Sequence, residues 1–117
     1  MIKHLEELAT DYRDNVRGGD GTVIQRNVLN GADEMNGKGR TYAHMILKPG
    51  CSIGFHVHTG DSECYYVLKG EGEYNENNER TVVLHAGDTT ITPDGCGHAI
   101  KNIGTEDFEF MALILYS

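Results

Sequence analysis

Short strand-forming runs, separated by turn residues, fill this 117-residue chain from Thr22 to its end. β-branched and aromatic residues favour strands, and the intervening turns carry Gly, Pro and Asn. Many short strands with frequent turns predict an all-β fold, either a sandwich or a double-sheet barrel. A chain of this length can bury its own core, so we expect one domain over residues 1–117. The predicted strands are 22–29, 41–48, 53–58, 63–69, 71–74, 81–84, 88–92, 97–103 and 108–116.

The segment before the first strand has a different pattern. Its apolar residues recur at helical spacing, and two consecutive glycines end the pattern at residue 18. We therefore expect a short N-terminal helix that packs on the barrel and covers an edge. The residues that carry this spacing are Ile2, Leu5, Leu8, Tyr12 and Val16.

The last predicted strand, 108–116, is apolar on both faces after Glu109. A strand with one solvated face should alternate between apolar and polar residues. The second face is therefore expected to be covered, either by the N-terminal segment or by another subunit. We expect a homodimer.

Charge and cysteine content limit the partners and the compartment. The net charge of −8 argues against nucleic acid or an anionic membrane as a partner. The three cysteines, Cys51, Cys64 and Cys96, are odd in number and form no CxxC pair, which favours a reducing compartment. Residues 1–14 have no apolar run long enough for a signal peptide or a membrane span. We expect a cytoplasmic protein.

Three histidines and one glutamate have the spacing of a metal site. His56 and His58 are two residues apart, so in a strand they share a face, with Cα atoms about 6.6–6.8 Å apart. If the turn-like residues 59–62 close a hairpin, Glu63 lies opposite His58. His98 has to arrive by tertiary folding. Together these four residues predict one octahedral site for a divalent transition metal.

The two segments that contain these residues, 50–70 and 87–102, resemble the signature motifs of the cupin superfamily. The first family motif is G(X)5HXH(X)3–4E(X)6G, and the second is G(X)5PXG(X)2H(X)3N. This chain is similar in particular to the small bacterial single-domain cupins described as mannose-6-phosphate-isomerase-like. The resemblance implies a jelly-roll barrel, a double-stranded β-helix, with the metal held inside by His56, His58, Glu63 and His98. The matching positions are Gly50, His56, His58, Glu63 and Gly70, then Gly87, Pro93, Gly95, His98 and Asn102.

Several functions fit such a site. Four protein ligands on an octahedral ion leave about two positions for water or a ligand, which suits chelation of a carboxylate or hydroxy acid. The first hypothesis is a metal-dependent enzyme, an isomerase, lyase or dioxygenase, that acts on a small sugar or carboxylate. The second is a binding or sensing module that holds a small carboxylate such as oxalate without turnover. A purely structural metal ranks last. Sites of this kind admit Mn, Fe, Co, Ni and Zn, and the sequence does not choose among them.

Three further residues have positions near the predicted ligands. Tyr65 is two residues past Glu63 and should share its inward face, either as a hydrogen-bond donor to a ligand or as a core aromatic. Cys96 is two residues before His98, and is either an extra ligand or a small core residue. Asp61 is either a hydrogen-bond acceptor or base beside the ligands, or simply a turn residue.

Overall fold

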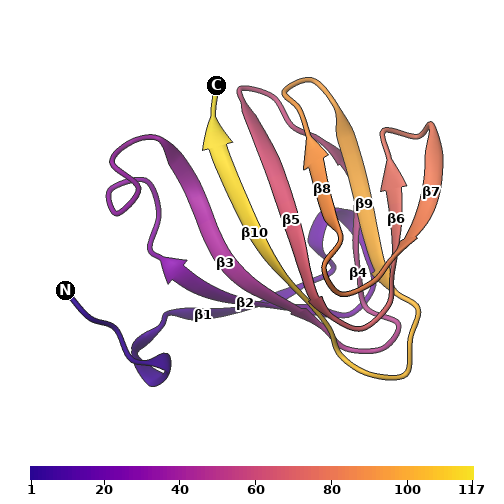
Figure 1. Ribbon diagram of the computed structural model, residues 1–117, viewed down its shortest axis with the longest axis horizontal. Helices are drawn as coiled ribbons and strands as arrows, with labels where there is room; N and C mark the ends of the chain where they lie inside the picture. Colours follow the sequence, from indigo (N-terminus) through magenta and orange to yellow (C-terminus); the bar gives the residue numbers. More distant parts are fainter.

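The computed structural model describes residues 1–117 as two antiparallel sheets that face each other (Figure 1). Its strands are β1 (Thr10–Asp14), β2 (Thr22–Leu29), β3 (Gly39–Leu47), β4 (Ser52–Val57), β5 (Asp61–Lys69), β6 (Gly72–Glu76), β7 (Arg80–Leu84), β8 (Thr89–Thr92), β9 (Gly97–Asn102) and β10 (Phe108–Tyr116). One sheet has the order β1-β2-β3-β10-β5-β8, and the other has the order β4-β9-β6-β7. The predicted all-β jelly-roll fold is confirmed.

All nine strands predicted from residue 22 onward are present, and their ends lie within two residues of the predicted ends. The alternation of inward and outward side chains explains this agreement. In β10, for example, Phe108, Phe110 and Ala112 are buried, while the residues between them face outward. Alternation of this kind marks a strand that has one side facing the core, and it allows such strands to be predicted from the sequence.

The predicted N-terminal helix is wrong for most of its length. Only Leu5–Glu7 forms a single 3-10 turn, η1, and Thr10–Asp14 instead forms the edge strand β1, paired with β2. Of the apolar residues at helical spacing, Ile2 is 80% and Tyr12 71% exposed, whereas Val16 is partly buried against the core. Pairing with the free edge of β2 satisfies the backbone of this segment better than an isolated helix would. No helix in the structure has the length and apolarity needed to span a membrane.

The hydrophobic core lies between the two sheets and includes the end at which β3 ends and β10 begins. Phe108 begins β10 and pairs with Leu47, and both are fully buried. Asn102 closes this end, because its side-chain amide donates to the carbonyl oxygens of Leu47 (2.8 Å) and Glu106 (2.7 Å). The other end, where β5 and β9 begin, contains the histidines. The fold therefore separates an apolar end from a polar end.

Candidate metal centre

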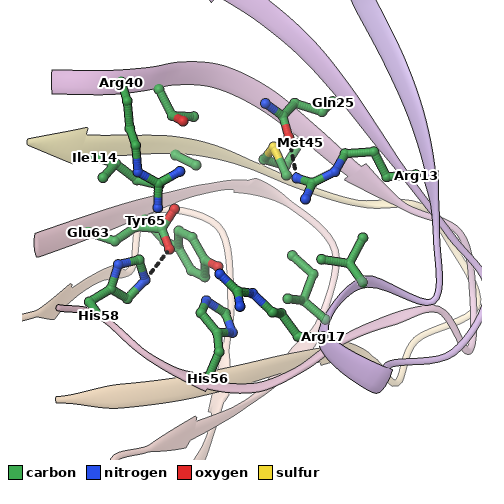
Figure 2. A pocket seen from close by; sticks show the side chains of 14 residues that line it. Arg13, Arg17, Gln25, Arg40, Met45, His56, His58, Glu63, Tyr65 and Ile114 are labelled. Carbon is green, nitrogen blue, oxygen red and sulfur yellow. Dashed lines mark hydrogen bonds and ion pairs between the residues drawn. The ribbon is translucent and has the colours of Figure 1, made fainter. Parts of the chain in front are cut away.

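Four side chains converge at the polar end of the barrel. One potential ligand atom from each of His56, His58, Glu63 and His98 lies within 4.8 Å of all the others. Figure 2 shows His56, His58 and Glu63 directed into one pocket. The structure thus brings together all four residues that the sequence indicated as metal ligands.

Pairing between β4 and β9 positions two of the histidines. His56 and His98 are direct cross-strand partners, and their ring centroids are 4.7 Å apart. His98 therefore lies opposite His56 within one sheet, and strand pairing sets the distance between them. Glu63 is the third residue of β5 and approaches from the other sheet.

The hairpin considered for residues 59–62 does not form. β4 pairs only with β9, whereas β5 pairs with β10 and β8, so the chain crosses from one sheet to the other after His58. His58 instead pairs with the turn before His98, since its N–H donates to the Cys96 carbonyl (2.9 Å) and its carbonyl accepts from the Gly95 N–H (2.7 Å). Turn residues predict a reversal of direction, but they do not say which sheet the next strand joins. His58 and Glu63 consequently face each other across the barrel.

The Nδ1 atoms of two histidines have acceptor partners. His56 Nδ1 lies 2.8 Å from the Gly54 carbonyl oxygen, and His58 Nδ1 lies 2.7 Å from Asp61 Oδ1. A carbonyl and a carboxylate oxygen can only accept, so Nδ1 carries the proton in both rings. In a neutral ring this leaves the Nε2 lone pair free for a metal, the arrangement usual for metal-binding histidines.

The third histidine is held by two hydroxyl groups. Tyr74 Oη and Thr92 Oγ1 each lie 2.9 Å from His98 Nδ1 and 2.8 Å from each other. His98 is almost fully buried, and its ring stacks on Tyr65 with centroids 5.0 Å apart. These contacts fix the orientation of the ring with Nε2 toward the cluster. The residues present therefore fit a divalent metal ion.

The charges of the cluster are strongly coupled. Burial opposes ionisation of Glu63, but the Nε2 atoms of His58 (3.1 Å) and His98 (3.0 Å) beside its Oε1 lower its pKa to about 2. This contact from His58 requires a proton on Nε2 as well as on Nδ1, so it belongs to the charged ring, and a metal ion would take the place of the Nε2 proton. The same hydrogen bond from His58 to Glu63 raises the pKa of His58. Burial lowers the pKa of His56. A permanently ionised carboxylate among imidazole nitrogens is a donor set that first-row divalent metals accept.

Three arginines, which the sequence reasoning did not single out, line the cavity next to the four residues. They come from separate elements: Arg13 from β1, Arg17 from the second 3-10 turn η2 (Val16–Gly18), and Arg40 from β3. Arg40 Nε donates to Asp61 Oδ2 (3.0 Å), which links this arginine to the His58–Asp61 pair. No motif or regular spacing relates the three arginines, so only the fold reveals that they are neighbours.

Tyr65 and Cys96 have different surroundings. Tyr65 is buried, lines the cavity, and packs on Phe110 with ring centroids 4.4 Å apart, so it is both a core aromatic and part of the pocket wall. Burial raises the pKa of its hydroxyl well above the usual value, and the group stays protonated. Cys96 does not line this cavity. It borders a separate surface hollow with Pro93 and Gly97.

The fold and the site together define a double-stranded β-helix with three histidines and one glutamate between its sheets. A family model described as a cupin domain, Cupin_2, matches residues 43–114. The chain belongs to this cupin family, as its motifs indicated.

Both comparisons, with curated proteins and with solved structures, find similarity to Thermotoga maritima over nearly the whole chain. A protein named oxalate-binding protein is 39% identical over 115 residues, which are 98% of this chain and 93% of the relative. A crystal structure described as a predicted oxalate decarboxylase is 38% identical, has a TM-score of 0.93, and covers both chains completely. A double-stranded β-helix protein of Klebsiella pneumoniae is 28% identical with a TM-score of 0.72, covering 98% of this chain and 89% of the other.

Proposed function

We propose that this protein binds a small dicarboxylate such as oxalate, at one divalent metal ion held by His56, His58, Glu63 and His98. One observation carries the proposal: arginine side chains without an acidic partner line the same cavity as His56, His58 and Glu63. Arg17 makes no side-chain ion pair or hydrogen bond, and Arg13 donates only to the neutral Gln25 side chain (2.9 Å). Unpaired cations beside a metal site favour an anionic ligand.

Each part of the site would have a separate task. When bound, the metal supplies positive charge and the coordination positions that chelating carboxylate oxygens occupy. The Nδ1 partners of the three histidines hold the rings in place. Arg13 and Arg17 are positioned to bind ligand oxygens that face away from the metal, and the protonated Tyr65 hydroxyl can donate a hydrogen bond.

The size of the cavity supports a small ligand. Its volume is about 80 Å³, whereas sites for drug-sized molecules enclose roughly 300–1,000 Å³. A two-carbon or three-carbon acid suits such a space better than a sugar phosphate. The name of the Thermotoga maritima oxalate-binding protein agrees with this choice.

The cavity wall supports binding more than turnover. Apart from His56, His58 and Glu63, its ionisable side chains are the three arginines and Tyr65. None of them is a carboxylate or a second histidine that could exchange a proton with a ligand near neutral pH, and the pKa of Tyr65 is raised further by burial. The enzyme hypothesis therefore lacks the placed acid or base that it requires.

Calorimetry on metal-loaded and metal-stripped protein tests the proposal. Oxalate is expected to bind the loaded protein with a stoichiometry near one per chain, and to bind the stripped protein at least about 100-fold more weakly, because chelation needs the ion. Acetate is the control, since it offers one carboxylate. Equal oxalate affinity with and without metal would contradict the proposal. Formate or CO2 released on incubation would instead support a decarboxylase.

We also propose that the protein is a homodimer formed through the outer face of the larger sheet. Apolar and aromatic side chains cluster there on neighbouring strands, at Tyr42, Tyr66, Ile91, Met111, Leu113 and Leu115. Light scattering is expected to give a mass near twice 12.9 kDa. Leu113→Asp should give a monomer with unchanged metal content, and Val83→Asp, on the exposed strand β7, should leave the dimer intact. A monomeric wild type would refute the dimer.

The cysteines support the proposed cytoplasmic location. Cys51, Cys64 and Cys96 are all free thiols in the structure. A fold that needs no disulfide suits a reducing compartment.

A further inference from the structure

The turn that carries Arg17 has a strained backbone. Asn15 and Arg17 both adopt left-handed conformations, with φ of 49° and 54°, which residues other than glycine rarely adopt. The turn is closed by local hydrogen bonds, from the Asn15 N–H to the Gly21 carbonyl (2.9 Å) and from the Asn15 side chain to the Gly19 carbonyl (3.1 Å). Strain of this kind persists where the surroundings impose it, and it concentrates at functional sites.

The surroundings in this case are the strand that leads to His56. A Cβ atom on Gly54 would lie 2.0 Å from the Arg17 carbonyl oxygen, and one on Gly19 would lie 2.3 Å from the Ser52 carbonyl oxygen. The turn and β4 therefore touch backbone to backbone, which only glycine permits. The Gly54 carbonyl accepts the Nδ1 hydrogen of His56. The turn therefore packs directly against the residue that orients the His56 ring.

The turn also carries positive charge, although the molecule as a whole is acidic. The chain has 10 Lys and Arg residues against 18 Asp and Glu residues, yet Arg17 has no carboxylate partner and Arg13 has only Gln25. Arg40 differs, because Asp61 neutralises it. Figure 2 shows the guanidinium of Arg17 pointing into the pocket, on the side where His56 and Tyr65 lie.

We propose that the segment Arg13–Gly19 is the charge-selective element of the ligand site. Arg17, assisted by Arg13, distinguishes ligands that keep a second negative charge beyond the metal from ligands of the same shape with a single charge. This inference rests on the proposed function. It assigns ligand choice to two residues that the metal does not need.

Oxalate and oxamate provide the test, because oxamate replaces one carboxylate of oxalate with a neutral amide of similar size. Calorimetry on the metal-loaded protein gives the affinity for each ligand. Wild type is expected to prefer oxalate, and Arg17→Gln is expected to weaken oxalate binding by about 5- to 20-fold while changing oxamate little, as for one lost charge-assisted hydrogen bond at an open site. Arg17→Lys should recover part of the preference, since it keeps the charge without the planar fork.

Two controls separate charge selection from a structural role. Arg80→Gln removes an exposed arginine that pairs with Glu76 away from the cavity, and should leave both affinities unchanged. Added salt should reduce the oxalate preference of wild type more than that of Arg17→Gln, because a charge at an open site is screened. Metal content, measured in parallel, should be the same in all variants.

The outcomes distinguish this inference from the proposed function. Equal loss of oxalate and oxamate affinity in Arg17→Gln, or an unchanged ratio, would overturn the inference while leaving oxalate binding intact. Wild type that holds metal but binds neither ligand would overturn the proposed function and this inference with it. A ratio of oxalate to oxamate affinity that falls only in the Arg17 variants would support both the proposed function and this inference.

Discussion

His56→Ala is expected to lower metal affinity by at least about 100-fold while the barrel remains folded. Loss of a group that merely supports a ligand commonly costs 10- to 100-fold, so loss of a ligand should cost at least the upper end of that range. His56 is only partly buried, and its side chain makes one hydrogen bond, to Gly54, so removing it disturbs little else. Competition with a chromophoric chelator measures the affinity, and circular dichroism checks the fold.

His85→Ala is the matched control for this experiment. His85 lies between β7 and β8 with 62% of its side chain exposed, outside the ligand group. Its replacement should leave metal affinity unchanged. Tight, stoichiometric metal in the His56 variant would show that the ion is not held by the four residues assigned here.

Phe110→Ala is expected to remove about 3–5 kcal/mol from the free energy of unfolding, the loss typical of a buried aromatic residue. The Phe110 ring is fully buried between Phe108 and Tyr65, with centroids 5.4 Å and 4.4 Å away. A domain of this size has only about 5–15 kcal/mol in total, so the variant should be close to the limit of folding. Urea unfolding of metal-stripped protein measures the loss without the added stability that a bound ion gives.

Tyr12→Ala serves as the comparison, because Tyr12 lies on the edge strand β1 and is 71% exposed. Its effect should stay within about 0.5 kcal/mol. If the two variants lose similar stability, the core does not depend on the aromatic cluster between the sheets.

Local patterns in the sequence predicted most of this fold. Strands β5, β8 and β10 alternate between buried and more exposed residues. The two motifs, 50–70 and 87–102, indicated His56, His58, Glu63 and His98. Within each strand and within each motif, the residues that form the pattern lie close together along the chain. Composition and spacing are sufficient to predict patterns that lie within such short stretches.

The errors concern information that only tertiary structure contains. The residues after His58 predict a turn, but the choice between a hairpin and a crossing to the other sheet depends on the edges that β10 and β9 offer. Residues 2–16 have helical spacing, but Thr10–Asp14 forms a strand because the edge of β2 is available to pair with it. The sequence pattern alone does not contain this edge. Arg13 and Arg17 were part of that expected helix, so their place at the cavity could not be foreseen.

The three arginines of the cavity all precede residue 43, where the match to the cupin family begins. The four proposed metal ligands all lie within that match. If both proposals hold, metal binding and ligand choice depend on two consecutive stretches of the chain, which touch where the Arg17 turn meets Gly54. On the proposal made here, substitutions before residue 43 can change which ligand the barrel binds during evolution. The protein would keep its metal throughout, because the metal ligands lie in the other stretch.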